Sequence, residues 1–189
     1  MRYITFFSFL FLFSCKINDF NFDNSQIFLL RNQIALDSIS NNFLKQKPVA
    51  NIIRRSTSKL FNIPSNSIEY YITCFNGENF NITITKNDEM NVWNENFQNI
   101  VDDNNLNKNL YNFCSTNEID LISIRNILNI MVNLNLWMLY KSSENNFIMY
   151  YIEPFDGLIF RNDNKYMNIA TNIQVEKIND SWYYFKEPY

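Results

Sequence analysis

The sequence predicts an α+β fold, with N-terminal helices, a β-hairpin, further helices and a C-terminal antiparallel β-meander packed as one domain. Three observations carry this prediction. Apolar residues recur at helical spacing over residues 26–44 and again over 91–101. An Asn-Gly pair separates two β-rich runs, 68–75 and 78–86. From Phe147 onward the chain consists of short β-rich runs divided by turn residues. Helical and strand runs occupy separate parts of the chain, which is typical of α+β proteins.

The N-terminal helices come from two neighbouring segments. Residues 26–44 form the first, with Ser25 as a candidate cap. Pro48 then breaks the chain and suits the first turn of a second helix, which we expect to reach about Leu60. The basic residues toward the end of this second helix are Arg54, Arg55 and Lys59. A solvated helix end is the simplest interpretation of this cluster, and a docking patch is the other.

The hairpin that follows has a register that can be argued from its apolar residues. A two-residue loop would pair Ile72 with Asn81, which sets a core residue against a polar one. A three-residue loop, 75–77, instead places Gly77 in the left-handed position of a bulged turn. The resulting pairs are Ile72 with Phe80, Tyr70 with Ile82 and Ile68 with Ile84. We therefore predict the three-residue loop.

Further helices and the meander complete the domain. Ser115 and Glu118 match a capping box, which predicts a helix from about Asn117 to at least Met131. Residues 132–140 are ambiguous, and the alternation over 133–136 favours a helix that ends near residue 132 and then a strand to Lys141. The expected strands after that are 147–153, 158–161, 167–178 and 181–186, with turns at 154–157 and 179–180. We expect Gly157, like Gly77, to supply a positive φ in a turn.

Composition excludes several classes of function. The chain has 189 residues, no histidine, two glycines and a formal net charge of −3. Without histidine, Ser-His-Asp and Cys-His catalysis and the usual zinc ligand are excluded. Two isolated glycines cannot form a Gly-rich phosphate loop. The negative charge disfavours nucleic-acid binding.

Catalysis would therefore depend on other side chains. The carboxylates on or beside strands and turns are Glu69, Glu78, Glu153 and Asp156. A pair of them could hydrolyse a glycoside, but no spacing singles out a pair. No calcium-loop spacing appears either. We expect a protein that is not an enzyme and has no cofactor and no metal site.

Aromatic residues offer a binding surface. Several strands carry aromatics on both faces, and one face of each must pack on the helices. The other face could form an exposed platform for a protein or a glycan. The candidate partner-binding residues are Tyr71, Tyr151, Trp182 and Tyr184. The alternative is that neighbouring elements cover both faces.

The first residues indicate location. Met1-Arg2 is cationic, and residues 3–13 are almost wholly apolar, a length that suits a signal-peptide core and is too short to span a bilayer. Leu12-Phe13-Ser14-Cys15 resembles the lipobox of bacterial lipoproteins, although Phe13 is bulkier than is usual there. In that family a diacylglycerol thioether forms on the cysteine, the peptide is cut before it, and the new amine is acylated. An ordinary secretory signal, with Cys15 incidental, is the alternative.

This resemblance implies a division of the chain. Residues 1–14 would be the signal peptide, 15–24 the lipidated cysteine with its tether, and 25–189 the α+β domain. Removing Arg2 with the signal changes the net charge from −3 to −4. The remaining cysteines, Cys74 and Cys114, could form one disulfide in an exported chain or stay as two buried free thiols.

The expected function follows from these features. We expect a lipoprotein held at a membrane through Cys15, acting as a binding protein for a protein partner in the cell envelope, such as an immunity-like protein or an accessory subunit. A glycan-binding module is the second candidate and a carboxylate hydrolase the third. Lys16 follows the cysteine in place of the aspartate that retains some lipoproteins at the inner membrane, which favours the outer membrane.

Overall fold

The computed structural model describes residues 20–56, 66–95, 97–144, 146–162 and 169–188. The helices are α1 (Phe22–Lys45), α2 (Glu89–Glu95), the 3-10 turn η1 (Phe97–Asn99), α3 (Leu110–Thr116) and α4 (Leu121–Asn133). The strands are β1 (Val49–Ser56), β2 (Ser67–Cys74), β3 (Asn79–Thr85), β4 (Val101–Asp102), β5 (Asn105–Asn109), β6 (Met138–Lys141), β7 (Phe147–Tyr151), β8 (Asp156–Arg161), β9 (Gln174–Lys177) and β10 (Trp182–Lys186). The fold is thus mixed α+β, as predicted.

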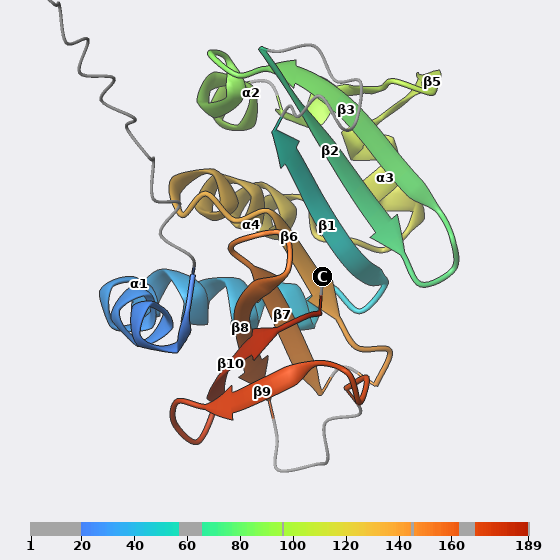
Figure 1. Ribbon diagram of the computed structural model, residues 1–189. Coiled ribbons are helices and arrows are strands. Elements are labelled where there is room, and N and C mark those ends of the chain that lie inside the picture. The colour runs from blue at the N-terminus through green and yellow to red at the C-terminus, as the bar shows by residue number, and fades with distance from the viewer. Residues whose placement is uncertain (1–19, 57–65, 96, 145, 163–168, 189) are drawn as a thin grey trace, which may run out of the picture.

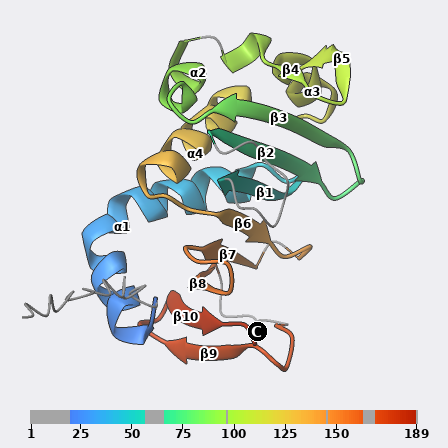
Figure 2. The ribbon, with the colours of Figure 1, turned by 45° about the horizontal axis from the view of Figure 1, so that its top comes forward.

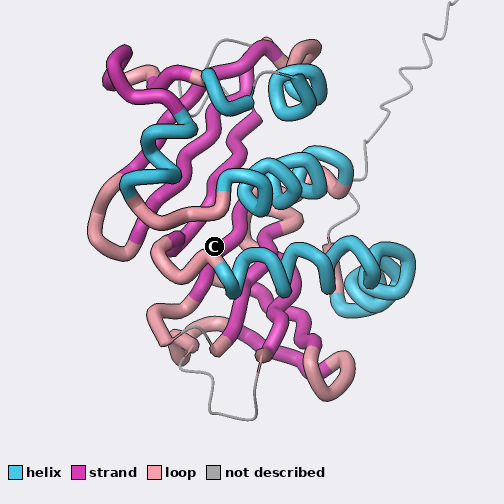
Figure 3. Tube along the Cα trace, turned by 180° about the vertical axis from the view of Figure 1, so that it is seen from behind, coloured by secondary structure: helices cyan, strands magenta, loops and turns pink. Residues whose placement is uncertain are grey.

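Eight strands form one antiparallel sheet in the order β3-β2-β1-β6-β7-β8-β10-β9, and β4 pairs with β5 separately. The helices lie on one side of this sheet, which faces the viewer in Figure 3. Figure 1 looks onto the other side, and no helix of the described residues covers it. We call this side the open face. Helix α1 starts beside β10 and runs to β1 at the middle of the sheet (Figure 2).

The core lies between the helices and the sheet. Helix α1 contributes Leu36, Ile39 and Phe43, each fully buried, and α4 contributes Ile124, Ile127 and Leu128. No helix among the described residues is both long and apolar enough to cross a membrane.

The hairpin prediction is confirmed. Strands β2 and β3 pair in the predicted register, with Ile72 opposite Phe80, Tyr70 opposite Ile82 and Ile68 opposite Ile84. The loop is residues 75–77, and Gly77 has a φ of +89°. Alternating burial along β2 follows from the two faces of a strand that is covered on one side only.

The predicted second helix, from Pro48 to Leu60, is wrong. Residues 49–56 form β1, a central strand between β2 and β6, and residues 57–60 lie outside the described residues. A strand with apolar residues on both faces lacks simple alternation, so its short apolar run resembles a buried helix. The β-branched pair Ile52-Ile53 favours the strand.

The middle of the chain also differs from the prediction. Residues 91–101 divide into the end of α2, the turn η1 and the start of β4, and β5 follows at Asn105–Asn109. Ser115 lies inside α3, so the predicted capping box is wrong. Helix α4 is capped by Asp120, whose side chain accepts a hydrogen bond from the amide of Ile122. Glu118, with a φ of +56°, lies in the turn between these helices.

The C-terminal strands form a meander with one change of order. Strands β6, β7 and β8 are consecutive neighbours, but β10 lies between β8 and β9. Part of the expected strand 167–178 lies outside the described residues, and only Gln174–Lys177 is a strand. The turn at 179–180 is confirmed, because Asn179 accepts backbone hydrogen bonds from Ser181 and Trp182.

Gly157 does not have the positive φ that we expected, and lies within β8. A Cβ atom there would collide with the backbone carbonyl of Tyr150 and would lie 2.9 Å from the ring of Phe185. The absence of a side chain is therefore required by close packing between β7, β8 and β10.

The N-terminal boundary of the domain lies earlier than residue 25. Phe20 is buried, its carbonyl oxygen accepts a hydrogen bond from the hydroxyl of Tyr184 (3.3 Å), and its ring lies 6.1 Å from that of Tyr184. Asn21 caps α1 by accepting a hydrogen bond from the amide of Asn24 at 2.9 Å. Residues 20–24, which we expected in the tether, therefore pack as part of the domain.

A buried ion pair joins β1 to α2. Arg54 donates two hydrogen bonds to the carboxylate of Glu89, at 2.7 and 2.9 Å, and a third to Asn135 at 2.9 Å. The hydroxyl of Tyr70 also donates to Glu89. Burial and the Glu89 carboxylate raise the pKa of Tyr70, so its hydroxyl stays protonated as a donor. Arg54 is therefore part of the core and not a solvated helix end.

Candidate functional site

The open face carries a cluster of large side chains near its centre. We call Ile53, Arg55, Tyr71, Met138 and Tyr140 the open-face patch. Tyr71 is opposite Ile53, and Ile53 is opposite Met138, so these three lie in one row across β2, β1 and β6. Arg55 and Tyr140 are two residues along from this row and share its face. Tyr140 is 37% exposed, and the other four are half-buried.

Tyr71 is held in place by two charged neighbours. Its hydroxyl donates a 2.8 Å hydrogen bond to Glu69, two residues along β2. The guanidinium carbon of Arg55 lies 5.1 Å from the centre of its ring, a cation–π distance. Partial burial and the Glu69 carboxylate raise the pKa of this tyrosine above its usual range. Tyr71 is thus a fixed aromatic side chain on a surface, which suits an anchor for a partner.

The other three predicted platform residues are buried, so the exposed four-residue platform is wrong. Trp182 faces the helices, with its ring 5.4 Å from Tyr150 and 5.1 Å from Phe160. Tyr184 packs against Phe20.

Tyr151 points to the opposite face but is covered there as well. It packs on Phe185 at 4.9 Å and donates a 2.7 Å hydrogen bond to Glu187. The partly buried Ile173 packs against the apolar cluster that contains both rings. At this end of the sheet both faces are covered, which is the alternative that the sequence left open.

The candidate carboxylates for hydrolysis lie apart. Glu69 and Glu78 are separated by the length of β2, roughly 17 Å at 3.3 Å per residue. Asp156 starts β8, four strands from β2, which is about 19 Å at the usual strand spacing. Glu153 and Asp156 share the turn between β7 and β8, where the amide of Asp156 donates to the carbonyl of Glu153. The structure does not bring these carboxylates from different strands into one cleft.

The two cysteines of the domain are buried free thiols. Burial raises the pKa of Cys114 to about 12 and also raises that of Cys74. Both therefore stay protonated at neutral pH, where thiols react slowly. Cys15, the predicted lipidation site, lies outside the described residues.

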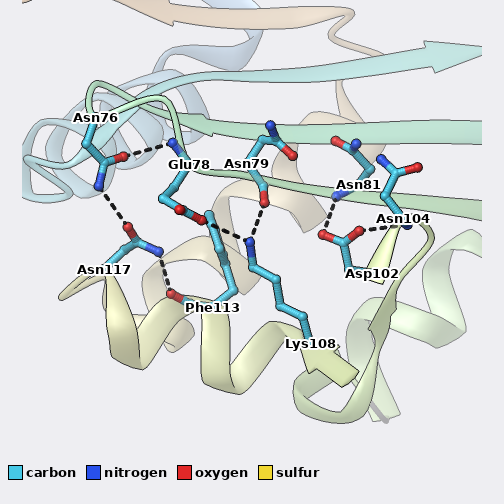
Figure 4. A network of polar contacts seen from close by, with 9 residues as sticks. All are labelled: Asn76, Glu78, Asn79, Asn81, Asp102, Asn104, Lys108, Phe113 and Asn117. Atoms are coloured by element: carbon cyan, nitrogen blue, oxygen red, sulfur yellow. Dashed lines mark hydrogen bonds and ion pairs between the residues drawn. The ribbon is translucent and has the colours of Figure 1, made fainter. Parts of the chain in front are cut away.

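The outer edge of β3 is covered by polar groups from β4, from β5 and from the turn between them (Figure 4). The amide of Asp103 donates to the carbonyl of Asn81 at 2.9 Å, and the side chain of Asp102 accepts from the amide of Asn81 at 3.3 Å. Lys108 donates to the carbonyl of Asn79 at 2.7 Å and pairs with Glu78 at 3.2 Å. These contacts use the groups that an added strand would need, so this edge is protected from strand addition.

Lys141, the last residue of β6, is buried, and its amine lies at the C-terminal end of α1. It donates hydrogen bonds to the carbonyl oxygens of Phe43 (3.2 Å) and Gln46 (2.6 Å), where α1 ends, and so places a cation at the negative end of the helix dipole. Burial lowers its pKa to about 8. Its contacts belong to the fold, and they explain why the loop after α1 is fixed.

Sequence reasoning identified Tyr71 but missed the other members of the open-face patch. Arg55 belonged to the basic cluster whose second interpretation was a docking patch. Met138 and Tyr140 alternate with the buried Leu139 and Lys141. This alternation could have identified the exposed side of β6, but a lysine at a buried position made the pattern hard to recognise.

Within the described ranges, no group of three or more Cys, Asp or Glu residues is placed to hold a metal ion. Comparison of the chain with protein-family models, curated proteins and solved structures finds no match.

Proposed function

We propose that this chain is a lipid-anchored binding protein of the bacterial cell envelope, outer membrane favoured, in which a single α+β domain docks a protein partner through the open-face patch. The observation that supports the docking site best is Tyr71, held between Glu69 and Arg55 on a sheet face that no described helix covers. An immunity-like protein or an accessory subunit of an envelope complex would act in this way.

The residue types of the patch suit a protein partner. Tyrosine and arginine are enriched among the residues that carry most of the binding energy at protein interfaces. Tyr71 loses little freedom on binding because its hydroxyl and its ring already have partners. Met138 and Ile53 supply apolar area between the two tyrosines. The patch therefore combines a fixed aromatic anchor with an apolar centre.

A glycan partner has less support. Sugar rings stack on exposed aromatic faces, and three of the four aromatics predicted for that role are buried. Tyr71 has its ring beside Arg55, which occupies part of the stacking surface. The lipid anchor rests on the lipobox resemblance of Leu12-Phe13-Ser14-Cys15.

Site-specific photocrosslinking in native membranes tests the docking site. A photoreactive amino acid replaces Tyr140 in one variant and Leu106 in the control. Leu106 is 81% exposed on β5, which lies beside the β3 edge of the sheet, whereas Tyr140 lies on the central strand β6. We expect one dominant protein adduct from position 140 and none of the same mass from position 106.

A second substitution tests Tyr71 as the anchor. Tyr71→Ala should lower the yield of the adduct from position 140 at least tenfold, because hot-spot residues typically contribute 2 kcal/mol or more. Circular dichroism and thermal unfolding of the variant establish that it is folded. Equal adducts from positions 140 and 106, or a folded Tyr71→Ala variant with an unchanged yield, would contradict the docking site.

A further inference from the structure

Helix α1 exposes an apolar stripe that the fold does not use. Ile27, Leu30 and Ile34 are 48, 75 and 89% exposed, and they lie one above another at helical spacing. We call these three residues the α1 stripe. The opposite side of the same helix carries Leu29, Leu36 and Ile39, which are buried in the core. Large apolar residues gathered on an exposed helix face mark an interaction surface.

The surroundings of the α1 stripe are those of a helix at a lipid surface. Arg31 is exposed on the same face, between Leu30 and Ile34, where its guanidinium can reach a lipid phosphate. Asp23 and Asp37 lie beyond the two ends of the stripe and not within it. An open depression beside the stripe is lined by Leu30, Ile34 and Ile130 of α4, and also by polar residues of α1 that include Arg31 and Asp37.

The length of chain before the domain limits how far the domain can lie from a lipid anchor. Phe20 is already packed against Tyr184, so only residues 16–19 separate it from Cys15. Five peptide steps span at most about 17 Å. An acylated Cys15 would therefore hold the start of α1 within about 17 Å of the bilayer surface. The stripe begins at Ile27, about 8 Å along the helix from Phe22.

We infer that the α1 stripe lies in the interface of the membrane that the acylated Cys15 occupies, so that α1 is a second contact between the domain and the lipid. This inference rests on the proposed lipid anchor. It orients the domain, because α1 belongs to the helix-covered side of the sheet and the open-face patch lies on the other side. The patch then stays accessible to a partner while the domain rests on the membrane.

Depth-dependent quenching tests this contact on the lipidated protein. The protein is purified from its membranes and reconstituted in vesicles of phosphatidylethanolamine and phosphatidylglycerol at a 3:1 ratio. One variant carries a fluorophore at Ile34→Cys, and the control carries it at Leu106→Cys. Cys74 and Cys114 are buried and Cys15 is acylated, so the new cysteine is labelled selectively. Both positions are more than four-fifths exposed, so the label does not disturb the core.

A nitroxide attached to a lipid should quench the label at position 34 at least threefold more than the label at position 106. A further variant, Ile27→Gln with Leu30→Gln, should bring the two values within twofold of each other. Equal quenching at positions 34 and 106 in an acylated protein would overturn the inference and leave the anchor standing. Protection of position 34 only after native membrane proteins are added would assign the stripe to a protein and also overturn it. A mass without acyl groups would refute the anchor itself.

Discussion

The burial of Lys141 and its low pKa could not be predicted from the sequence. A lysine near the end of a strand is ordinarily solvated, yet this one is fully buried and donates to two carbonyl oxygens at the end of α1. Burial disfavours the charged amine and lowers its pKa from the ordinary 10.5 to about 8. Between these two values the native amine is neutral while the unfolded amine is protonated.

This difference predicts a pH dependence of stability. Because the unfolded state binds more protons between about pH 8 and 10.5, Lys141 makes the free energy of unfolding rise with pH there, by up to about 1.4 kcal/mol per pH unit. Lys141→Met should lack this contribution. Urea unfolding of both proteins at pH 7.5, 8.5 and 9.5 measures the difference, and the tyrosine titrations that both proteins share largely cancel. A difference that does not change with pH would contradict the low pKa.

At the residue scale, the sequence does not show which side chains are covered by other elements. Tyr71 was predicted as a surface aromatic and is one, whereas Trp182 and Tyr184 were predicted beside it and are buried. Strand alternation separates the two faces of a strand, but it does not tell which other element covers a face. That depends on α1 and on residues near Ile173, which pack from distant parts of the chain.

At the scale of elements, the two glycines differ in the reason for which each is needed. Gly77 has a φ of +89° with open space around a Cβ atom, whereas a Cβ atom on Gly157 would collide with the carbonyl of Tyr150. We expect Gly77→Ala to cost about 1 kcal/mol from backbone strain and Gly157→Ala to cost about 3 kcal/mol from the collision. Denaturant unfolding measures both. Equal costs would show that the β7–β8 packing is looser than described.

The ion pair between β1 and α2 gives a second prediction at this scale. Arg54→Met leaves the Glu89 carboxylate buried without its cation and should lower the free energy of unfolding by about 3–5 kcal/mol. The double variant Arg54→Met with Glu89→Gln removes the uncompensated charge, and the glutamine can still accept from Tyr70. It should recover at least half of the loss in a denaturant titration. Additive losses in the double variant would mean that the two residues are not coupled.

Local elements were predictable where local signals agree. The β2–β3 register follows from the Asn-Gly turn and the alternating isoleucines, and it is confirmed. Strand β1 was not predictable, because its buried residues include Arg54, whose partner Glu89 is 35 residues away. The helix after residue 117 was predicted with the wrong cap, because Asp120 competes with Ser115 and lies closer to the true start.

At the scale of the whole molecule, β1 joins the two parts of the sheet that the sequence suggested separately. The hairpin lies on one side of it and the strands from β6 onward on the other. These pairings connect residues more than 80 positions apart, such as Ile53 with Met138, and no local pattern encodes them. The open-face patch spans this junction, so its composition could not be predicted before the sheet order was known.

The proposed location of the molecule at a membrane rests on its first residues together with the packing of Phe20. If Cys15 carries the anchor, the short segment before Phe20 holds the domain against the membrane and leaves little freedom for it to turn. Both the docking of a partner and the membrane contact of α1 depend on this anchor. The state of Cys15 is therefore the central claim.

The most direct test is the intact mass of the protein extracted from its own membranes, compared with that of a Cys15→Ala variant. We predict a mass that lacks residues 1–14 and includes a diacylglycerol thioether and one amide-linked acyl chain, and we predict that the variant shows neither change. A mass equal to that of the full chain, or cleavage without acylation, would contradict the lipid anchor.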